Sequence, residues 1–358
     1  MTDLLYSEAE TDLRAAVRSL LTTRADPAAL VAGRAESGSP YDPGVWTALA
    51  AEVGAAGLLV PEKLGGQGAG HREAAVVLEE LGRSVTPAPY LTSSVVATEV
   101  LLTLGTETDA VTALLGDLAA GRRTAVTALP LSAAADGPLP VDSPVVTGVA
   151  DAVLADAFLV LRADGLYLLE RSDVTVEPQT ALDLTRPLAA VTPGTAGTRI
   201  ADRAEGEAAV RRGLLTGAGL LASEQLGVAE WCLEETVRHT RERHQFNRPL
   251  GSFQALKHRM AQLWLEVVSA RAAARAAADA LATGSPDAAL TVAVAQAYCS
   301  RVAVHAAEEC VQLHGGIGMT WEHPAHLYLK RAKADEIALG TPGRHQEALA
   351  ALVDLQAP

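Results

Sequence analysis

A run of three glycines within four positions is the first feature of the chain that could bind a ligand. Gly315, Gly316 and Gly318 lie in the stretch VQLHGGIGMTWEHP at residues 311–324. Glycine leaves room where another group comes close to the backbone, and it adopts positive φ without strain. A Rossmann fingerprint or a P-loop requires a strand before its glycines, whereas the preceding residues predict a helix and no Gly-Lys-Ser/Thr follows. The run alone therefore fits either a binding loop or a glycine helix end followed by a turn.

A second candidate is a basic segment in an otherwise acidic protein. The stretch RERHQFNRPLGSFQALKH, residues 241–258, contains Arg241, Arg243, Arg248, Lys257 and His258. Arginine and amide side chains beside a helix N-terminus can bind an anion, because guanidinium groups pair with phosphate and the helix dipole is positive there. Basic residues also suit the C-terminus of a helix, where the dipole is negative. Both interpretations remain open for this segment by itself.

Composition limits the class of protein and of ligand. The chain has 358 residues and a net charge of −14, which argues against a general binder of nucleic acid or of anionic membranes. The three cysteines, Cys232, Cys299 and Cys310, lack metal-like or redox-pair spacing, so we expect buried thiols. The N-terminus is acidic and amphipathic, unlike a signal peptide, and no apolar run is long enough to span a bilayer. We therefore expect a soluble, cytoplasmic protein.

The hydrophobic pattern divides the chain into three parts. Apolar residues at spacings of three and four predict helices at 12–21, 45–53, 72–81 and 93–104. From about residue 124 to 200, short runs rich in Val, Thr and Leu alternate with turn residues and predict a small β domain. Helical periodicity returns at 207–243, continues in a helix that we expect Ser252 to cap, and ends in a helix from Asp287 to about 313. We place the domains at 1–122, 123–205 and 206–358.

The clearest local signal in the middle part is a hairpin. The stretch LVLRADGLYLLE, residues 159–170, places Asp164-Gly165 between two runs of strand-forming residues. This dipeptide suits a two-residue turn between antiparallel strands. The order of helices, then a β domain, then a helical bundle predicts an α+β protein that is mainly α.

Taken together, the glycine run and the basic segment resemble the acyl-CoA dehydrogenase family. The family's Arg-x-Gln-Phe-x-x-Pro-Leu-x-x-Phe-Gln and its later Gln-x-x-Gly-Gly-x-Gly-x-Thr-x-Glu are matched by Arg243, Gln245, Phe246, Pro249, Leu250, Phe253 and Gln254, and by Gln312, Gly315, Gly316, Gly318, Thr320 and Glu322. The early segment PEKLGGQGAG also matches the family. The resemblance covers nearly the whole chain. It implies the acyl-CoA dehydrogenase fold, with an N-terminal helical domain, a middle β domain and a C-terminal four-helix bundle.

The resemblance also implies a chemistry and a set of partners. Family members take the α and β hydrogens from an acyl-CoA thioester: a carboxylate removes the α proton, hydride passes to FAD, and an electron-transfer flavoprotein reoxidises the flavin. FAD lies across a subunit interface, which implies an oligomer. The implied FAD contacts in this chain are Arg243, Gln245, Phe246, Gln312, Gly315, Gly316 and Thr341. Gly315 and Gly316 would be bare because the adenosine end of the partner's FAD passes against them.

The catalytic base of the family is missing from both of its usual positions. One position precedes the Gly-Thr of the segment ADEIALGTPG, where this chain has Leu339. The other lies on the long helix of the C-terminal domain and falls near Gly217. Neither leucine nor glycine can accept a proton. Glu224 and Glu336 are candidates for a displaced base, although a lone glutamate is more often a surface or core-edge acid.

The β domain departs from the family as well. The usual Glu-Pro-x-x-Gly-Ser segment is replaced by ALPLSAAADG, and all four tryptophans lie outside this domain. Thr127 and Ser132 are the side chains left there that could form hydrogen bonds to a flavin.

Three functional interpretations follow. The first is an FAD-dependent acyl-CoA dehydrogenase, or a subunit of one, with its base elsewhere. The second is a non-catalytic subunit that completes the FAD site of a glutamate-bearing partner. The ending HGGIGMTWEHPAHLYLKRAKADE resembles actinobacterial steroid-degrading members that assemble as α2β2 heterotetramers, which implies a bulky or steroid-derived acyl chain. The third is a family member that performs other chemistry on a carrier-bound acyl group.

The sequence also bears on a metal site and on a serine hydrolase site. His323 and His326 stand three residues apart and could form a metal-binding pair on a helical turn. The sequence suggests no third ligand and the family binds no metal, so we predict no metal site. No Gly-x-Ser-x-Gly elbow is present, which argues against a serine hydrolase.

Overall fold

The N-terminal part is a layer of helices that packs against the long helix α7 (Arg203–Glu242). The computed structural model describes residues 4–26, 29, 41–105 and 108–355. The elements of this part are α1 (Glu8–Arg24), α3 (Pro43–Thr47), α4 (His71–Ser84), α5 (Thr98–Leu104) and α6 (Asp109–Ala119), the π-helical turns η1 (Ala48–Glu52) and η4 (Tyr90–Ala97), and the 3-10 turns η2 (Ala55–Gly57) and η3 (Glu62–Leu64). Leu78, Leu81 and Val100 are among the apolar residues that fill the core of this layer.

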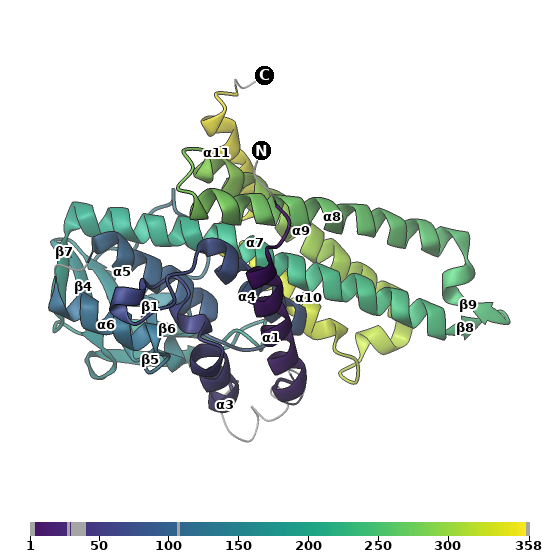
Figure 1. Ribbon diagram of the computed structural model, residues 1–358, viewed down its shortest axis with the longest axis horizontal. Coiled ribbons are helices and arrows are strands. Elements are labelled where there is room, and N and C mark those ends of the chain that lie inside the picture. The colour runs from purple at the N-terminus through teal and green to yellow at the C-terminus, as the bar shows by residue number, and fades with distance from the viewer. Residues whose placement is uncertain (1–3, 27–28, 30–40, 106–107, 356–358) are drawn as a thin grey trace.

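The middle part consists of two small sheets (Figure 1). Its strands are β1 (Ala125–Thr127), β2 (Val146–Ala150), β3 (Ala157–Arg162), β4 (Gly165–Glu170), β5 (Val174–Gln179), β6 (Leu188–Pro193) and β7 (Thr198–Asp202). One sheet has the order β1-β3-β4-β7, in which β1 and β3 are parallel and the other pairs are antiparallel. The second has the antiparallel order β2-β6-β5. Phe158 and Leu169 from the first sheet and Val191 from the second belong to one buried cluster, so the two sheets share a core.

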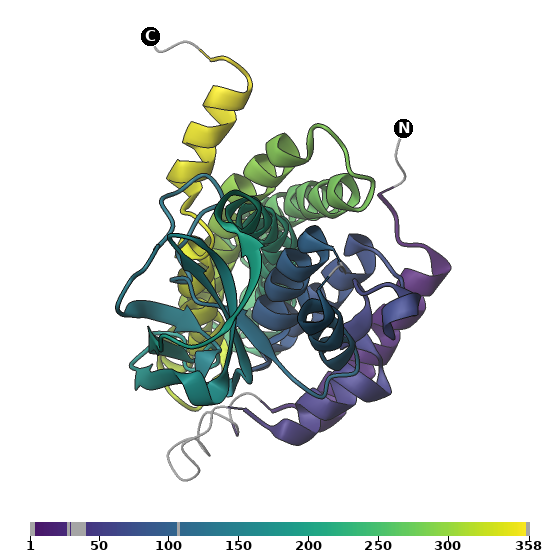
Figure 2. The ribbon, with the colours of Figure 1, turned by 90° about the vertical axis from the view of Figure 1, so that its left-hand side faces the viewer.

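The C-terminal part is a four-helix bundle of α7, α8 (Gln254–Ala282), α9 (Ala288–His314) and α10 (Ala325–Ile337). Helix α7 has 40 residues, which makes it about 60 Å long. It runs from the β domain to the hairpin of β8 (His244–Gln245) and β9 (Arg248–Pro249) at the opposite end of the molecule (Figure 1). Helix α11 (Pro342–Leu352) packs on α9 and projects from the rest of the chain toward the C-terminus (Figure 2).

Most predicted elements are present in the structure. Some of their ends differ from the predicted ones because contacts with other segments set the boundary. Ser252 was expected to cap a helix and does not: it lies in the 3-10 turn η7 (Leu250–Ser252), and its hydroxyl donates to the Pro249 carbonyl at 2.7 Å. The hairpin turn is Ala163-Asp164 instead of Asp164-Gly165, because Arg162 pairs with Gly165. The expected boundary between residues 205 and 206 falls inside the first turn of α7. In the described part of the chain, no helix is both long and apolar enough to cross a membrane.

Helices α4 and α7 touch backbone to backbone, and two glycines make this possible. A Cβ atom on Gly82 would lie 2.0 Å from the Glu224 carbonyl oxygen, and one on Gly227 would lie 1.9 Å from the Glu79 carbonyl oxygen. Real Cβ atoms do not come this close, so any side chain at either position would push the two helices apart. The contact holds the N-terminal layer against the middle of α7.

We expect Gly227→Ala to lower the free energy of unfolding by roughly 2–3 kcal/mol, because the added methyl overpacks a backbone contact that cannot move aside. The matched control is Gly343→Ala in α11, where a Cβ would meet nothing within 4 Å. In that open position alanine should stabilise the helix slightly. Urea unfolding measures both changes. Equal effects of the two substitutions would contradict this account of the helix contact.

Candidate active site

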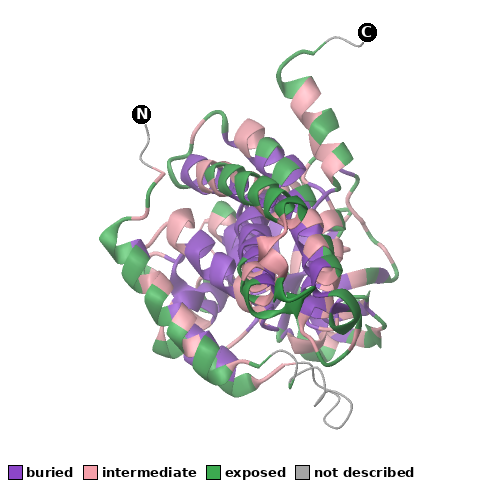
Figure 3. Ribbon diagram, turned by 90° about the vertical axis from the view of Figure 1, so that its right-hand side faces the viewer, coloured by how far each residue is buried: buried purple, intermediate pink, exposed green. Residues whose placement is uncertain are grey.

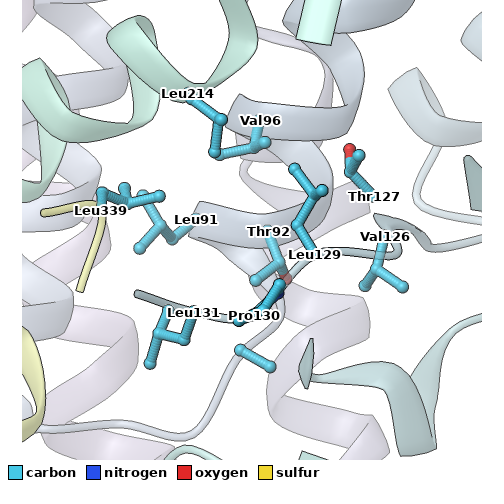
Figure 4. Close-up of a pocket in the computed structure, with 11 residues that line it drawn as sticks. Leu91, Thr92, Val96, Val126, Thr127, Leu129, Pro130, Leu131, Leu214 and Leu339 are labelled. Atoms are coloured by element: carbon cyan, nitrogen blue, oxygen red, sulfur yellow. The ribbon is translucent and has the colours of Figure 1, made fainter. Parts of the chain in front are cut away.

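The two positions that lack a base lie next to each other in the structure. A Cβ atom on Gly217, in α7, would lie 3.1 Å from Cδ1 of Leu339, which follows α10, and 2.6 Å from Cγ2 of Val96. Leu339 and Val96 line a cavity of about 40 Å³, a volume with room for a few water molecules. The lining side chains come from η4, the end of β1, α7 and the Leu339 loop (Figure 4).

The loop that carries Leu339 is held rigidly in place by its backbone. Leu339 is buried and has a φ of 54°, and Gly340 after it has a φ of 108°. The Leu339 amide donates to the Leu131 carbonyl at 2.8 Å. The Leu339 carbonyl accepts a hydrogen bond from His345 Nε2 at 3.1 Å, and burial lowers the pKa of His345. These contacts fix the backbone of Leu339, and its side chain lines the cavity. The family resemblance places the carboxylate base at this position.

The cavity wall holds almost no polar group. Of the described residues that line it, only Thr92 and Thr127 have a polar side-chain atom. Thr92 donates to Oδ2 of Asp151 at 2.7 Å. Thr127 Oγ1 is buried and has no hydrogen-bond partner in the described part of the chain. A hydroxyl is a poor base at neutral pH, so the cavity contains nothing that could remove a proton from carbon.

Glu224, the first candidate for a displaced base, belongs to a buried ion network. Its Oε1 accepts from Arg331 at 2.5 Å and from Arg186, and all three side chains are buried. Burial favours the neutral acid, but the two arginines hold the pKa of Glu224 below its usual value. Arg331 also pairs with Asp183 at 2.5 Å. Two guanidinium groups therefore share Oε1 of Glu224, and this carboxylate holds the β domain to the bundle.

Glu336, the second candidate, points to a different part of the surface. Its carboxylate lies 3.5 Å from Lys333 Nζ and is about one-third exposed. It lines a separate groove of about 550 Å³ together with residues of α8 and α9, including Glu266 and His305. The structure therefore brings neither candidate glutamate to the cavity at Leu339.

Most of the expected FAD contacts gather at the far end of α7. Arg243 directly follows this helix, and Gln245 and Phe246 lie in the β8–β9 hairpin. The hairpin faces the viewer, exposed, in Figure 3, and the Phe246 side chain is 87% exposed. His239, one turn before Arg243, stacks at 4.2 Å on His314, the residue before Gly315. The hairpin and the glycine run are therefore neighbours.

The glycine run itself is open to a ligand. Gly315 ends α9 with a φ of 63°, and neither it nor Gly316 has any atom within 4 Å of an added Cβ. Gln312 lies in the last turn of α9. Thr341 is the exception among the expected contacts: it caps α11 beside Leu339, where its hydroxyl accepts from the Arg344 amide at 3.3 Å.

The cavity and the open loops are too far apart to serve one flavin within one chain. Gly217 and Arg243 are 26 residues apart on a continuous helix, a distance of about 39 Å. This exceeds the length of an extended FAD molecule. The cavity and the open loops therefore lie near opposite ends of this stretch of α7.

Comparison with known proteins decides the family. Residues 7–122 match the N-terminal domain of acyl-CoA dehydrogenases, and residues 204–353 match their C-terminal domain. The chain belongs to the acyl-CoA dehydrogenase family. It is 38% identical to the acyl-CoA dehydrogenase IpdE2 of Mycolicibacterium smegmatis over 94% of this chain and 96% of that protein. The family and the fold expected from the sequence are thereby confirmed, and the family consists of oxidoreductases.

Two solved structures are similar over nearly the whole chain. The ChsE4–ChsE5 complex from Mycobacterium tuberculosis matches with a TM-score of 0.85 and 25% identity, covering 100% of both chains. The steroid acyl-CoA dehydrogenase Tcur3481–Tcur3483, as a G363A variant, matches with a TM-score of 0.84 and 27% identity, covering 97% of this chain and 98% of that one.

Asp151, which accepts from Thr92 behind the cavity, provides a test of the burial in this region. Burial raises its pKa to about 6, from an ordinary value of 3.8. The folded state therefore favours the protonated acid, and the stability that this proton provides is lost as the pH rises through 6. Asp151 has a φ of 56°, which asparagine tolerates well.

We expect Asp151→Asn to stabilise the protein at neutral pH, because the amide is never charged. Its advantage over the parent protein should grow by about 1 kcal/mol or slightly more between pH 5 and pH 7.5. The matched control is Asp142→Asn, an exposed aspartate with a φ of 48°. Urea unfolding at the two pH values measures both. An Asp151→Asn advantage that does not change with pH would contradict the burial of this charge.

Proposed function

We propose that this chain is the subunit without a base in a heteromeric, FAD-dependent acyl-CoA dehydrogenase. The observation that carries the proposal is that Gly217 lies against Leu339 and Val96, two residues that line a small apolar cavity of about 40 Å³. Removal of an α proton requires a base within hydrogen-bond reach of it. Neither a base nor an acyl chain fits in this cavity.

The loops at the C-terminal end of α7 are open and carry polar residues. These features support a role in cofactor binding. When bound, FAD would accept the hydride that leaves the acyl-CoA, as in the rest of the family. In this chain, Arg243 would pair with the pyrophosphate, and Gln245 and Gln312 would form polar contacts. Gly315 and Gly316 would allow close approach of the adenosine end, because an added Cβ at either meets nothing. Phe246, 87% exposed, would be covered by the partner.

The partner follows from what this chain lacks. It must carry the missing glutamate, an open acyl cavity and the groups that hold the flavin ring. A second member of the same family meets these needs, in an arrangement such as α2β2. The similarity to the ChsE4–ChsE5 complex supports a heteromer.

The substrate class and the electron acceptor are also part of the proposal. We infer a bulky or steroid-derived acyl-CoA, because a similar solved structure is that of a steroid acyl-CoA dehydrogenase. The acceptor would be an electron-transfer flavoprotein, as the family resemblance implies. A single chain with a displaced base is the competing function, and the two differ in what the isolated chain does.

The test of the proposed function is expression of the chain alone and together with a glutamate-bearing family member from the same genome. Alone, we expect little bound flavin and no dehydrogenation of a panel of acyl-CoA thioesters. Co-expression should yield a stable complex that retains FAD and is active, because each half-site is then complete. Full flavin loading and turnover by the isolated chain would refute the proposal.

A second prediction concerns Arg243 in the co-purified complex. Arg243→Ala should reduce the FAD retained after gel filtration at least several-fold, because one charge-assisted contact to the pyrophosphate is lost. Thermal unfolding of the flavin-free complex should be unchanged. Arg241→Ala, two residues earlier in the same basic segment, is the matched control and should retain FAD. The same loss in both variants would show a general charge effect and contradict a specific contact.

A further inference from the structure

Three side chains that can bind metal meet where α7 and α9 end. Glu235 lies in the last two turns of α7, His314 is the last residue of α9, and His323 lies in the loop before α10. One ligand atom from each lies within 4.8 Å of the other two. The sequence separates these residues widely, which is why the pair His323 and His326 gave no hint of Glu235 as a further ligand.

One ring nitrogen of His314 is buried and has no hydrogen-bond partner among the described residues. Its side chain is fully buried. Nδ1 donates to the Cys310 carbonyl at 2.6 Å, so in the neutral imidazole the lone pair is on Nε2. Nε2 has no hydrogen-bond partner among the described residues. Glu235 Oε1 is 3.6 Å from Nε2, too far for a hydrogen bond. A buried ring nitrogen without a partner is costly, so an occupant is expected.

The distances fit a small divalent cation. Zinc binds imidazole nitrogen and carboxylate oxygen at about 2.1 Å, and tetrahedral geometry then puts neighbouring ligand atoms about 3.4 Å apart. Glu235 Oε1 lies 3.4 Å from His323 Nε2 and 3.6 Å from His314 Nε2. A metal-bound histidine usually donates its other nitrogen to a carbonyl or carboxylate, as His314 does to Cys310. Glu235 also pairs with Arg238 through both of its oxygens, Oε2 at 2.9 Å and the ligand atom Oε1, so a metal ion at Oε1 would share this oxygen with the guanidinium group.

We propose that Glu235, His314 and His323 form a structural site for a divalent transition metal ion of the zinc type. Water would complete the coordination. The ion would tie together the end of α7, the end of α9 and the loop before α10, and so fix the glycine run that begins at Gly315. The site does not depend on the proposed function, because its ligands are all in this chain and none of them is an expected FAD contact.

Binding requires one rearrangement at His323. Its Nδ1 accepts a hydrogen bond from the Ala325 amide at 3.2 Å, so in the metal-free protein Nε2 carries the proton and faces Glu235. When Nε2 binds the metal, the proton moves to Nδ1 and the contact with Ala325 is lost. His323 is in a loop and partly exposed, so its ring can turn. The competing occupant of the cluster is a proton on His314 Nε2, which would face the same carboxylate.

The test is a titration of Zn²⁺ into the purified protein, alone or in the co-purified complex, followed by calorimetry. Co²⁺ in place of Zn²⁺ should give the visible absorption of a four-coordinate site. We expect one ion per chain. Glu235→Gln and His314→Gln should each weaken binding by about tenfold or more. The control is His326→Gln, because His326 also has a buried, unpartnered nitrogen but lies outside the cluster.

Each outcome decides the matter. Tight binding to the parent protein and to His326→Gln, but not to the two cluster variants, supports the site. If the parent protein binds no Zn²⁺, the proposed site is wrong, and a proton shared within the cluster is the occupant instead. An equal loss of binding in His326→Gln also overturns the proposal. Circular dichroism shows whether each variant folds. If His314→Gln does not fold, His323→Gln at the partly exposed loop position replaces it and should show the same loss.

Discussion

The arrangement of this protein depends on the buried ion network around Glu224. This carboxylate on α7 binds Arg186 from the β domain and Arg331 from α10, and Arg331 binds Asp183. Charges this deeply buried are stable only as a complete set, since removal of one partner leaves another unpaired. The network therefore sets where the β domain sits on the bundle. The network also argues against Glu224 as the base, because its Oε1 holds two guanidinium groups.

The position of the network determines the character of the neighbouring cavity. With the β domain fixed, the Leu131 carbonyl receives the Leu339 amide, and Leu339 fills the space beside Gly217. The loops at the other end of α7 are open and carry the residues that match the family's FAD contacts. Helix α7, with its 40 residues, thus separates the small apolar cavity at Leu339 from the open loops beside the β8–β9 hairpin. This separation is the physical basis of the division of labour that we propose between two chains.

The sequence predicts those features that depend on local pattern or on a long motif. Helical periodicity placed α4, α7 and α9 within a few residues of their ends, and the paired motifs identified the family. It could not predict features that depend on contacts between distant segments. The cap at Ser252 fails because the Pro249 carbonyl takes its hydroxyl. The partners of Glu224 come from the segment ALDLTRP and from α10, and Glu235 reaches His314 only when α7 and α9 pack together.

The most direct test of the central claim is an experimental structure of the chain in complex with its glutamate-bearing partner. The account predicts flavin only in the partner's cavity, with its adenosine end against Arg243 and Gly315 of this chain. The space between Thr127 and Leu339 should hold no flavin and no acyl chain. Flavin bound at Thr127 in this chain, with acyl-CoA beside Leu339, would contradict the account.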